Sequence, residues 1–159
     1  MLLLLADGTQ LPVAELPGQG PWTFLVLQPD PVPPGPAYLT RFGRVVVPDL
    51  RGRPGWGAAP DTPGFLDLVD DLDQVRTRAG LGRPVLVGLD ELAPLARRAA
   101  ADQPWAWRAL LVTPPADPAS LDLPALVLEG DPAPAVEELL GRLGPGPGWA
   151  GIAPDAPPR

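Results

Sequence analysis

The sequence predicts one α/β domain with a mostly parallel, doubly wound sheet, and three observations support this fold class. Short, wholly apolar runs recur along the chain and are stopped by Gly, Pro or Asp, as in parallel strands buried between helix layers. Segments with apolar residues at helical spacing alternate with the later runs. The 159 residues are 45% hydrophobic, which is enough to bury one sizeable core.

The apolar runs define the expected strands. Residues 2–5, the pair Asp7-Gly8 and residues 11–16 are expected to form an N-terminal antiparallel hairpin. Pro12 has no backbone N–H, so we expect the second hairpin strand to lie at an edge of the sheet. Five buried strands follow, predicted at residues 24–27, 44–47, 84–87, 110–113 and 125–128.

The first helix is predicted to start at Thr62, where a capping side chain precedes Pro63 at the first helical position. It is expected to end near Gly80 or Gly82. Its acids are expected to form a solvated face near the helix N-terminus, where negative charge is favoured. These acids are Asp67, Asp70, Asp71 and Asp73.

Two more helices complete the alternation of strand and helix. One is predicted to begin at about Glu91, to tolerate Pro94 in its first turn and to close at Gln103-Pro104. The other follows Asp131-Pro132. We expect a single domain over residues 1–159, with an irregular Pro/Gly-rich tail from about residue 144 in which only residues 149–152 could be a strand.

Charge and missing residue types exclude several function classes. A formal net charge of −7 repels a phosphate backbone, so nucleic acid is not an expected partner. The chain contains no cysteine and no histidine, which removes the thiol nucleophile, the thiolate metal ligand and the usual proton carrier near neutral pH. No resident metal or cofactor is therefore expected.

The N-terminal stretch MLLLLADG bears on localisation. Its apolar run is far too short to span a membrane and no basic segment precedes it, so we expect an edge strand of a cytoplasmic protein that does not bind membranes. The chain lacks lysine and asparagine and has 26 prolines and 18 glycines, a thermophile-like composition that GC-rich coding bias would also produce.

Three motifs together carry a resemblance to a known fold family. The segment VVVPDLRGRPGWG within residues 44–57 resembles the V-x-x-x-D-x-R-G-x-G strand and loop of many α/β-hydrolase-fold enzymes. PVLVG is similar to the strand that enters the family's nucleophile elbow, and ALVLEGD resembles the strand that carries the triad acid. The resemblance covers about residues 20–135 and implies the α/β-hydrolase fold. Within the first motif, we expect Asp49 to hold its loop by local hydrogen bonds.

The elbow of the family reads Gly-x-Ser-x-Gly, and residues 88–92 of this chain read Gly-Leu-Asp-Glu-Leu. The resemblance therefore puts Asp90 at the nucleophile position, where family members similar to haloalkane dehalogenases and epoxide hydrolases also use an aspartate. Leu92 replaces the second glycine, which disfavours the strained elbow turn. We expect Asp90 to act as a helix N-cap rather than as a nucleophile, and likewise Asp131 at the triad-acid position.

Other parts of the family's site are also replaced. Gln28-Pro29 stands at the oxyanion-loop position, and proline cannot donate a backbone N–H. Residues 114–124 are too few for a helical cap domain, so the site is expected to be cap-less and open. Trp56 lies in the loop that should rim the carboxyl edge of the sheet, where an indole could face a ligand or partner.

Three functional hypotheses follow. The favoured one is a non-catalytic hydrolase-like domain with a degenerate active site that acts in binding or assembly, on an unknown small molecule or protein and with a homodimer as one arrangement. The alternative is an atypical hydrolase, similar to an epoxide hydrolase or dehalogenase, that uses Asp90 without a histidine. The third is a divalent-cation or small-ligand site built from strand-end carboxylates, namely Asp30, Asp49, Asp90, Glu129 and Asp131.

Overall fold

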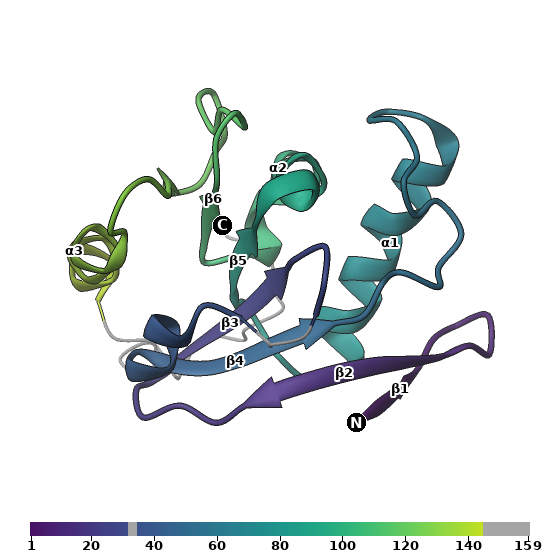
Figure 1. Ribbon diagram of the computed structural model, residues 1–159, viewed down its shortest axis with the longest axis horizontal. Coiled ribbons are helices and arrows are strands. Elements are labelled where there is room, and N and C mark those ends of the chain that lie inside the picture. The colour runs from purple at the N-terminus through teal and green to yellow at the C-terminus, as the bar shows by residue number, and fades with distance from the viewer. Residues whose placement is uncertain (32–34, 145–159) are drawn as a thin grey trace.

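A seven-stranded sheet runs through the part of the chain that the computed structural model describes, residues 1–31 and 35–144 (Figure 1). The strand order is β1-β2-β4-β3-β5-β6-β7, with parallel pairing from β4 to β7 and antiparallel pairing at β1 and β2. All the predicted strands are present, so the predicted fold class is confirmed. Their bounds are β1 Leu2–Leu4, β2 Gln10–Leu16, β3 Trp22–Leu27, β4 Gly43–Pro48, β5 Val85–Gly88, β6 Ala109–Val112 and β7 Ala125–Val127.

Helices cover both faces of the sheet. Figure 1 shows α1 (Pro63–Arg78) and α2 (Ala93–Asp102) on one side and α3 (Ala133–Leu143) on the other. The short 3-10 helix η1 (Ala37–Arg41) joins β3 to β4, and η2 (Asp90–Leu92) leads directly into α2. The three predicted helices are confirmed, and the arrangement is doubly wound.

The core consists of two apolar layers, one on each face of the sheet. Along β3, Phe24 and Val26 pack in the layer that includes α3, whereas Leu25 and Leu27 pack in the layer that includes α1 and α2. All four side chains are fully buried. Burial of a large apolar side chain contributes about 1.5–3 kcal/mol, so the central strands rigidly position the loops at their carboxyl ends.

The hairpin corrects one prediction about strand order. Strand β2 is not an edge strand, because it pairs with β1 on one side and with β4 on the other. Pro12 is tolerated there because it stands at the limit of both ladders: it pairs with Leu2 at one end of the β1 ladder, and the β4 ladder begins only at Val13. The apolar start of the chain, β1, forms the edge, as expected.

Helix α1 begins and ends as its sequence predicts. The Thr62 hydroxyl accepts a hydrogen bond from the Phe65 N–H at 3.4 Å, and Pro63 occupies the first turn. The helix closes before Gly80, whose φ of +68° is in the left-handed region that glycine tolerates.

The connection between β6 and β7 contains no helix. Residues 113–124 form only turns and irregular backbone, so no cap lies between these two strands. The possible strand predicted at residues 149–152 falls outside the described residues. Among the described residues, no helix is both long and apolar enough to cross a membrane.

Candidate functional site

The turn after β5 has the sharp geometry of a nucleophile elbow. Asp90 adopts φ +52°, a left-handed conformation that non-glycine residues rarely adopt. Two neighbouring strands hold the turn: the Leu89 N–H donates to the Leu27 carbonyl at 2.9 Å, and the Asp90 N–H donates to the Thr113 hydroxyl at 2.7 Å. The turn forms although Leu92, which is expected to disfavour it, replaces the second glycine; the Leu92 side chain turns inward and is only 9% exposed.

Close packing of β5 against α2 explains the first glycine of the elbow. A Cβ atom on Gly88 would lie 2.9 Å from the Ala93 Cα and 2.5 Å from the Ala96 Cβ. Any side chain there would push the helix from the strand. The start of α2 is therefore held tightly over the end of β5.

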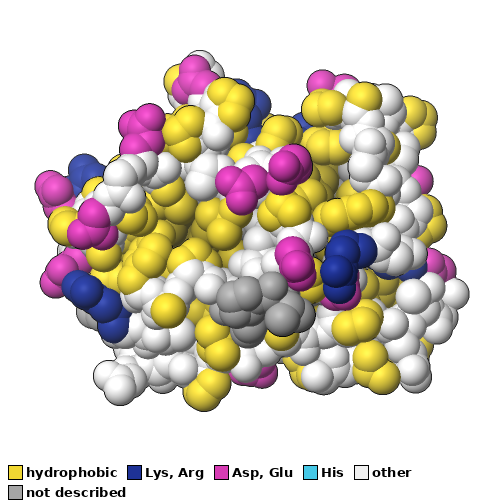
Figure 2. Space-filling view, viewed as in Figure 1, with side chains coloured by type: hydrophobic (Ala, Val, Ile, Leu, Met, Phe, Trp, Pro, Cys, Tyr) yellow, Lys and Arg dark blue, Asp and Glu magenta, His cyan; other side chains and the backbone are white. Residues whose placement is uncertain are grey.

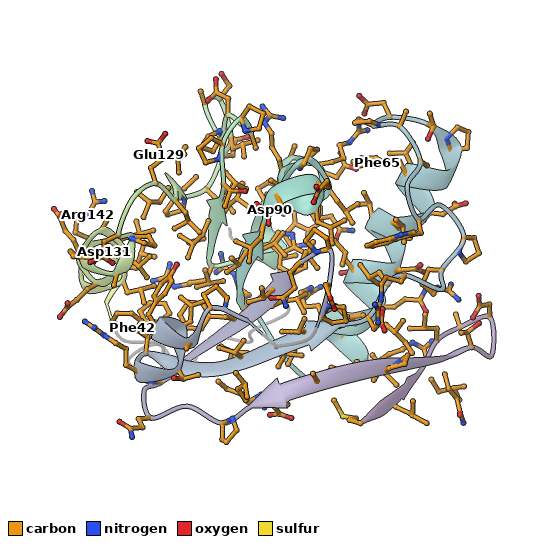
Figure 3. All side chains as sticks on the ribbon, in the orientation of Figure 1. Phe42, Phe65, Asp90, Glu129, Asp131 and Arg142 are labelled. Atoms are coloured by element: carbon orange, nitrogen blue, oxygen red, sulfur yellow. The ribbon has the colours of Figure 1, made fainter. Side chains whose placement is uncertain are left out.

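The expected capping role of Asp90 is wrong. The N-cap positions of η2 and α2 are Leu89 and Leu92, and neither helix start has a side-chain cap hydrogen bond. Asp90 is exposed, and no basic side chain of the described residues forms an ion pair with it or with Glu91. The elbow thus presents a bare carboxylate to solvent (Figure 3).

At the oxyanion-loop position, the Gln28 side chain is committed to holding the loop after β3. Its Nε2 donates to the Asp30 carbonyl at 2.7 Å, and its Oε1 accepts from the Gly35 N–H at 2.9 Å. These bonds tie together the two ends of the described part of the loop. Pro29, the next residue, has no N–H and so cannot donate to an oxyanion as the family's loop does.

Asp131, at the triad-acid position, serves the start of α3. Its carboxylate accepts from the Ala133 N–H at 3.3 Å, although the N-cap residue is Pro132. The expected capping role is therefore displaced by one residue rather than lost. Figure 3 shows Asp131 and Glu129 on the α3 side of the molecule, away from Asp90.

The strand-end carboxylates do not converge on a cation site. Within residues 1–31 and 35–144, no three acidic side chains are close enough together to hold a metal ion. Asp49 is held by Arg51, which donates from Nε and NH2 at 2.9 Å each and from its backbone N–H at 3.1 Å. These bonds lower the pKa of the Asp49 carboxyl and confirm that Asp49 holds its own loop.

A buried ion cluster beneath the same loop was missed by the sequence reasoning. The Arg53 guanidinium pairs with Asp71 on α1 at 3.0 Å and with Asp7 in the β1–β2 turn at 2.9 Å. The hydrogen bonds that Arg53 donates to Asp71 raise the pKa of Arg53, and those that Thr9 and Arg53 donate to Asp7 lower the pKa of Asp7 to about 2. The prediction that Asp71 is part of a solvated face is therefore wrong. Asp71 is 5% exposed, and its ion pair with Arg53 connects α1 to the loop after β4.

Two hollows adjoin the elbow. The first is an apolar pocket of about 440 Å³ between the loop after β4, the start of α1 and α2. The second is an open groove of about 450 Å³ over the loop after β3, and Asp90 lines it together with Gln28. Pro29 and Glu91 line both hollows, so the two lie next to each other. Trp56 lines the first, at the edge where the sequence predicts it.

Several solved structures of α/β hydrolases are similar to this chain in their overall fold. An α/β hydrolase from Sphaerobacter thermophilus matches with a TM-score of 0.55 and 27% identity, over 71% of this chain and 44% of its own. A carboxylesterase of Nitrososphaera gargenis matches with a TM-score of 0.56 and 16% identity over the same shares. A serine hydrolase without a lid from Xanthomonas campestris matches with a TM-score of 0.54 and 21% identity, over 89% of this chain and 77% of its own.

The fold and these likenesses place the chain in the α/β-hydrolase-fold superfamily. The described residues match the form of this fold that has no lid, as in the Xanthomonas protein. The chain spans 44% of the length of each of the first two structures. No protein-family model and no curated protein sequence matches the chain.

Proposed function

We propose that this chain is a non-catalytic, hydrolase-like binding domain whose ligand site lies at the carboxyl edge of the sheet. One observation carries the proposal: the elbow turn keeps its left-handed backbone, but the family's general base is missing. The chain contains no histidine, and no side chain of the described residues pairs with the carboxylate of Asp90. The backbone turn of the site is present, and the histidine that the family's reaction requires is missing.

The chemical requirements of the alternative make this argument specific. An aspartate nucleophile forms an ester with its substrate, and release of product then needs a base that activates water. The chain contains no histidine, which is the usual base for this step. Pro29 has no N–H, so this residue also contributes nothing to oxyanion stabilisation.

The apolar pocket gives the binding role a physical basis. Its volume of about 440 Å³ suits a small molecule, and its walls come from segments that the buried strands and α1 hold in place. Binding to a protein partner or to a second copy of the chain stays a prediction. Sedimentation velocity at several concentrations would test the homodimer.

One observation favours the atypical hydrolase as a second candidate. Asp90 keeps the left-handed backbone of an elbow residue, and its carboxylate lines an open groove. A left-handed non-glycine residue costs free energy and is common at catalytic turns. Asp61 and Ser120 also have positive φ, yet they lie in exposed turns, so the conformation alone does not indicate chemistry.

Covalent labelling separates the two candidates. The protein is incubated with epoxide and haloalkane mechanism-based probes, and intact mass and peptide mapping of residues 84–97 are recorded. The binding-domain proposal expects no stoichiometric adduct, and Asp90→Asn should behave like the unmodified sequence. An adduct of one probe per chain on Asp90, or turnover of an ester, epoxide or haloalkane that Asp90→Ala abolishes, would establish the hydrolase instead.

A further inference from the structure

The apolar pocket beside the elbow has one charged side chain at its mouth. Its walls include Pro29, Trp56, Phe65, Leu68 and Leu95, and Glu91 is the one charged group among the described residues that line it. Figure 3 shows Phe65 on α1 facing the region where α2 begins. A ligand in this pocket would therefore bury an apolar body and meet a carboxylate at its exposed end.

The adjoining groove is also lined by acidic side chains. Asp30, Asp90 and Glu91 line it, and no arginine is among its described lining residues. Arg51 lies 3.9 Å from Asp30 but is held on both carboxylate oxygens of Asp49, and it forms no ion pair with Asp90 or Glu91. Figure 2 shows acidic groups beside apolar side chains near the middle of this face. Among the described residues that line the two hollows, the charged side chains are all acidic.

Backbone packing keeps the pocket preformed. Gly55 has φ +91°, and a Cβ atom there would collide with the carbonyl oxygen of Gly64 at the start of α1. The loop that carries Trp56 thus packs closely against α1. The backbone N–H of Trp56 donates to the Arg53 carbonyl at 3.2 Å. Arg53 is in turn fixed by its buried pair with Asp71. A ligand would meet a wall that needs little ordering on binding.

We propose that this pocket and groove bind an organic cation with an apolar body, such as an aromatic or alkylated amine. The inference rests on the binding function proposed above and names its ligand class. The apolar walls hold the body, the indole of Trp56 offers a surface that attracts a cation, and Glu91 and Asp90 supply the opposite charge. An anionic ligand of the same shape is repelled by these two carboxylates, and a neutral one gains only the apolar contact.

Isothermal titration with three matched probes tests the ligand class. The probes are benzyltrimethylammonium, benzyl alcohol and phenylacetate, which share a benzyl group and differ in charge. We expect the cation to bind about tenfold more tightly than the alcohol, and phenylacetate to bind more weakly than both. Raising the salt concentration should narrow the difference, because the carboxylates are exposed and screened.

Two substitutions locate the site. Glu91→Gln removes the charge at the pocket mouth and is expected to weaken cation binding about fivefold while leaving benzyl alcohol unchanged. Glu129→Gln is the matched control, because Glu129 is an exposed carboxylate that lines neither hollow, and it should change nothing. Both positions are exposed, so the melting temperature should stay the same in each variant.

The possible outcomes separate this inference from the proposed function. Equal affinity for the cation and the alcohol, no binding of any probe, or equal effects of Glu91→Gln and Glu129→Gln would overturn the cation site. Turnover that depends on Asp90 would overturn the non-catalytic proposal, whatever the probes bind. A cation preference lost in Glu91→Gln, without turnover, would support both.

Discussion

Two charged clusters, one around Arg53 in the loop after β4 and one at the elbow after β5, differ in burial and pairing. In the first, the side chains of Arg53 and Asp71 are 8% and 6% exposed and pair with each other, with Asp7 at the rim. In the second, Asp90 and Glu91 are exposed and meet no basic side chain among the described residues. The first cluster joins α1 to the sheet, and the second only borders a pocket.

The difference shows which charges the fold requires. A buried charge is tolerated only when it is paired, so Arg53 and Asp71 cannot be changed singly without a large loss of stability. An exposed charge costs the fold little, so Asp90 and Glu91 can be changed while the domain stays folded. In the motif that begins at Asp49, the charged side chains hold the structure: Arg51 binds Asp49, and Arg53 binds Asp71.

Breaking the buried cluster should give the largest effect. Arg53→Leu leaves Asp71 buried and unpaired, so the free energy of unfolding in urea should fall by about 3–5 kcal/mol. Arg51→Leu, which breaks a more exposed pair, should cost far less. Leucine at both 53 and 71 should recover most of the loss. Similar costs for the two single variants would refute the distinction between the clusters.

Next in size is the packing beneath the elbow. Gly88→Ala places a Cβ atom against α2, and overpacking of this kind should lower the free energy of unfolding by about 1–3 kcal/mol. Gly52→Ala is the control, because a Cβ atom there meets nothing within 4 Å, and its effect should stay within about 0.5 kcal/mol. Chemical denaturation of both variants measures the difference. An unchanged Gly88→Ala would mean that β5 and α2 are not tightly packed.

The backbone of the elbow should respond in the opposite direction. Asp90→Gly relieves the left-handed strain at φ +52° and is expected to raise the free energy of unfolding by about 0.5–1 kcal/mol. Glu91→Gly, one residue later and without a positive φ, should instead lower it by about 0.5–1 kcal/mol. Thermal unfolding distinguishes the signs. A loss in both variants would show that Asp90 makes a stabilising contact.

The smallest expected effect is an acid-dependent one at the rim of the buried cluster. The pKa of Asp7 is lowered from 3.8 to about 2, so its contribution to stability is present above pH 4 and is lost as the pH falls towards 2. Asp7→Asn should therefore reduce the fall in melting temperature between pH 4 and pH 2. Asp67→Asn, an exposed acid of α1, should leave the fall unchanged. Identical pH profiles for the two variants would contradict the role of Asp7.

Much of the fold could be predicted because its signals are local. Central strands buried on both faces are continuously apolar, and α1 carries its own cap at Thr62. Pro12 was misplaced because its tolerance depends on where two ladders end, which the sequence of one strand does not reveal. Register is a property of the neighbouring strands.

The candidate site was less predictable, because its geometry is set by distant residues. Asp71 lies three residues after Leu68 and four before Val75, so its place on the buried stripe was readable, but its partner Arg53 was not. The turn at Asp90 is held by Leu27 and Thr113, which belong to two other segments. The burial of Leu92 and these tertiary hydrogen bonds together hold the backbone of the turn without the second glycine.

The helix-free connection between β6 and β7 makes the domain a tractable scaffold for engineering. Its middle, around Ala119 and Ser120, is exposed, and Arg97 on α2 anchors the preceding stretch through the Asp117 carbonyl. Closure entropy grows only slowly with loop length, so a grafted helical hairpin would lower stability little. Because the connection leaves the carboxyl end of β6, such an insert would add residues at the edge of the sheet that carries the candidate site.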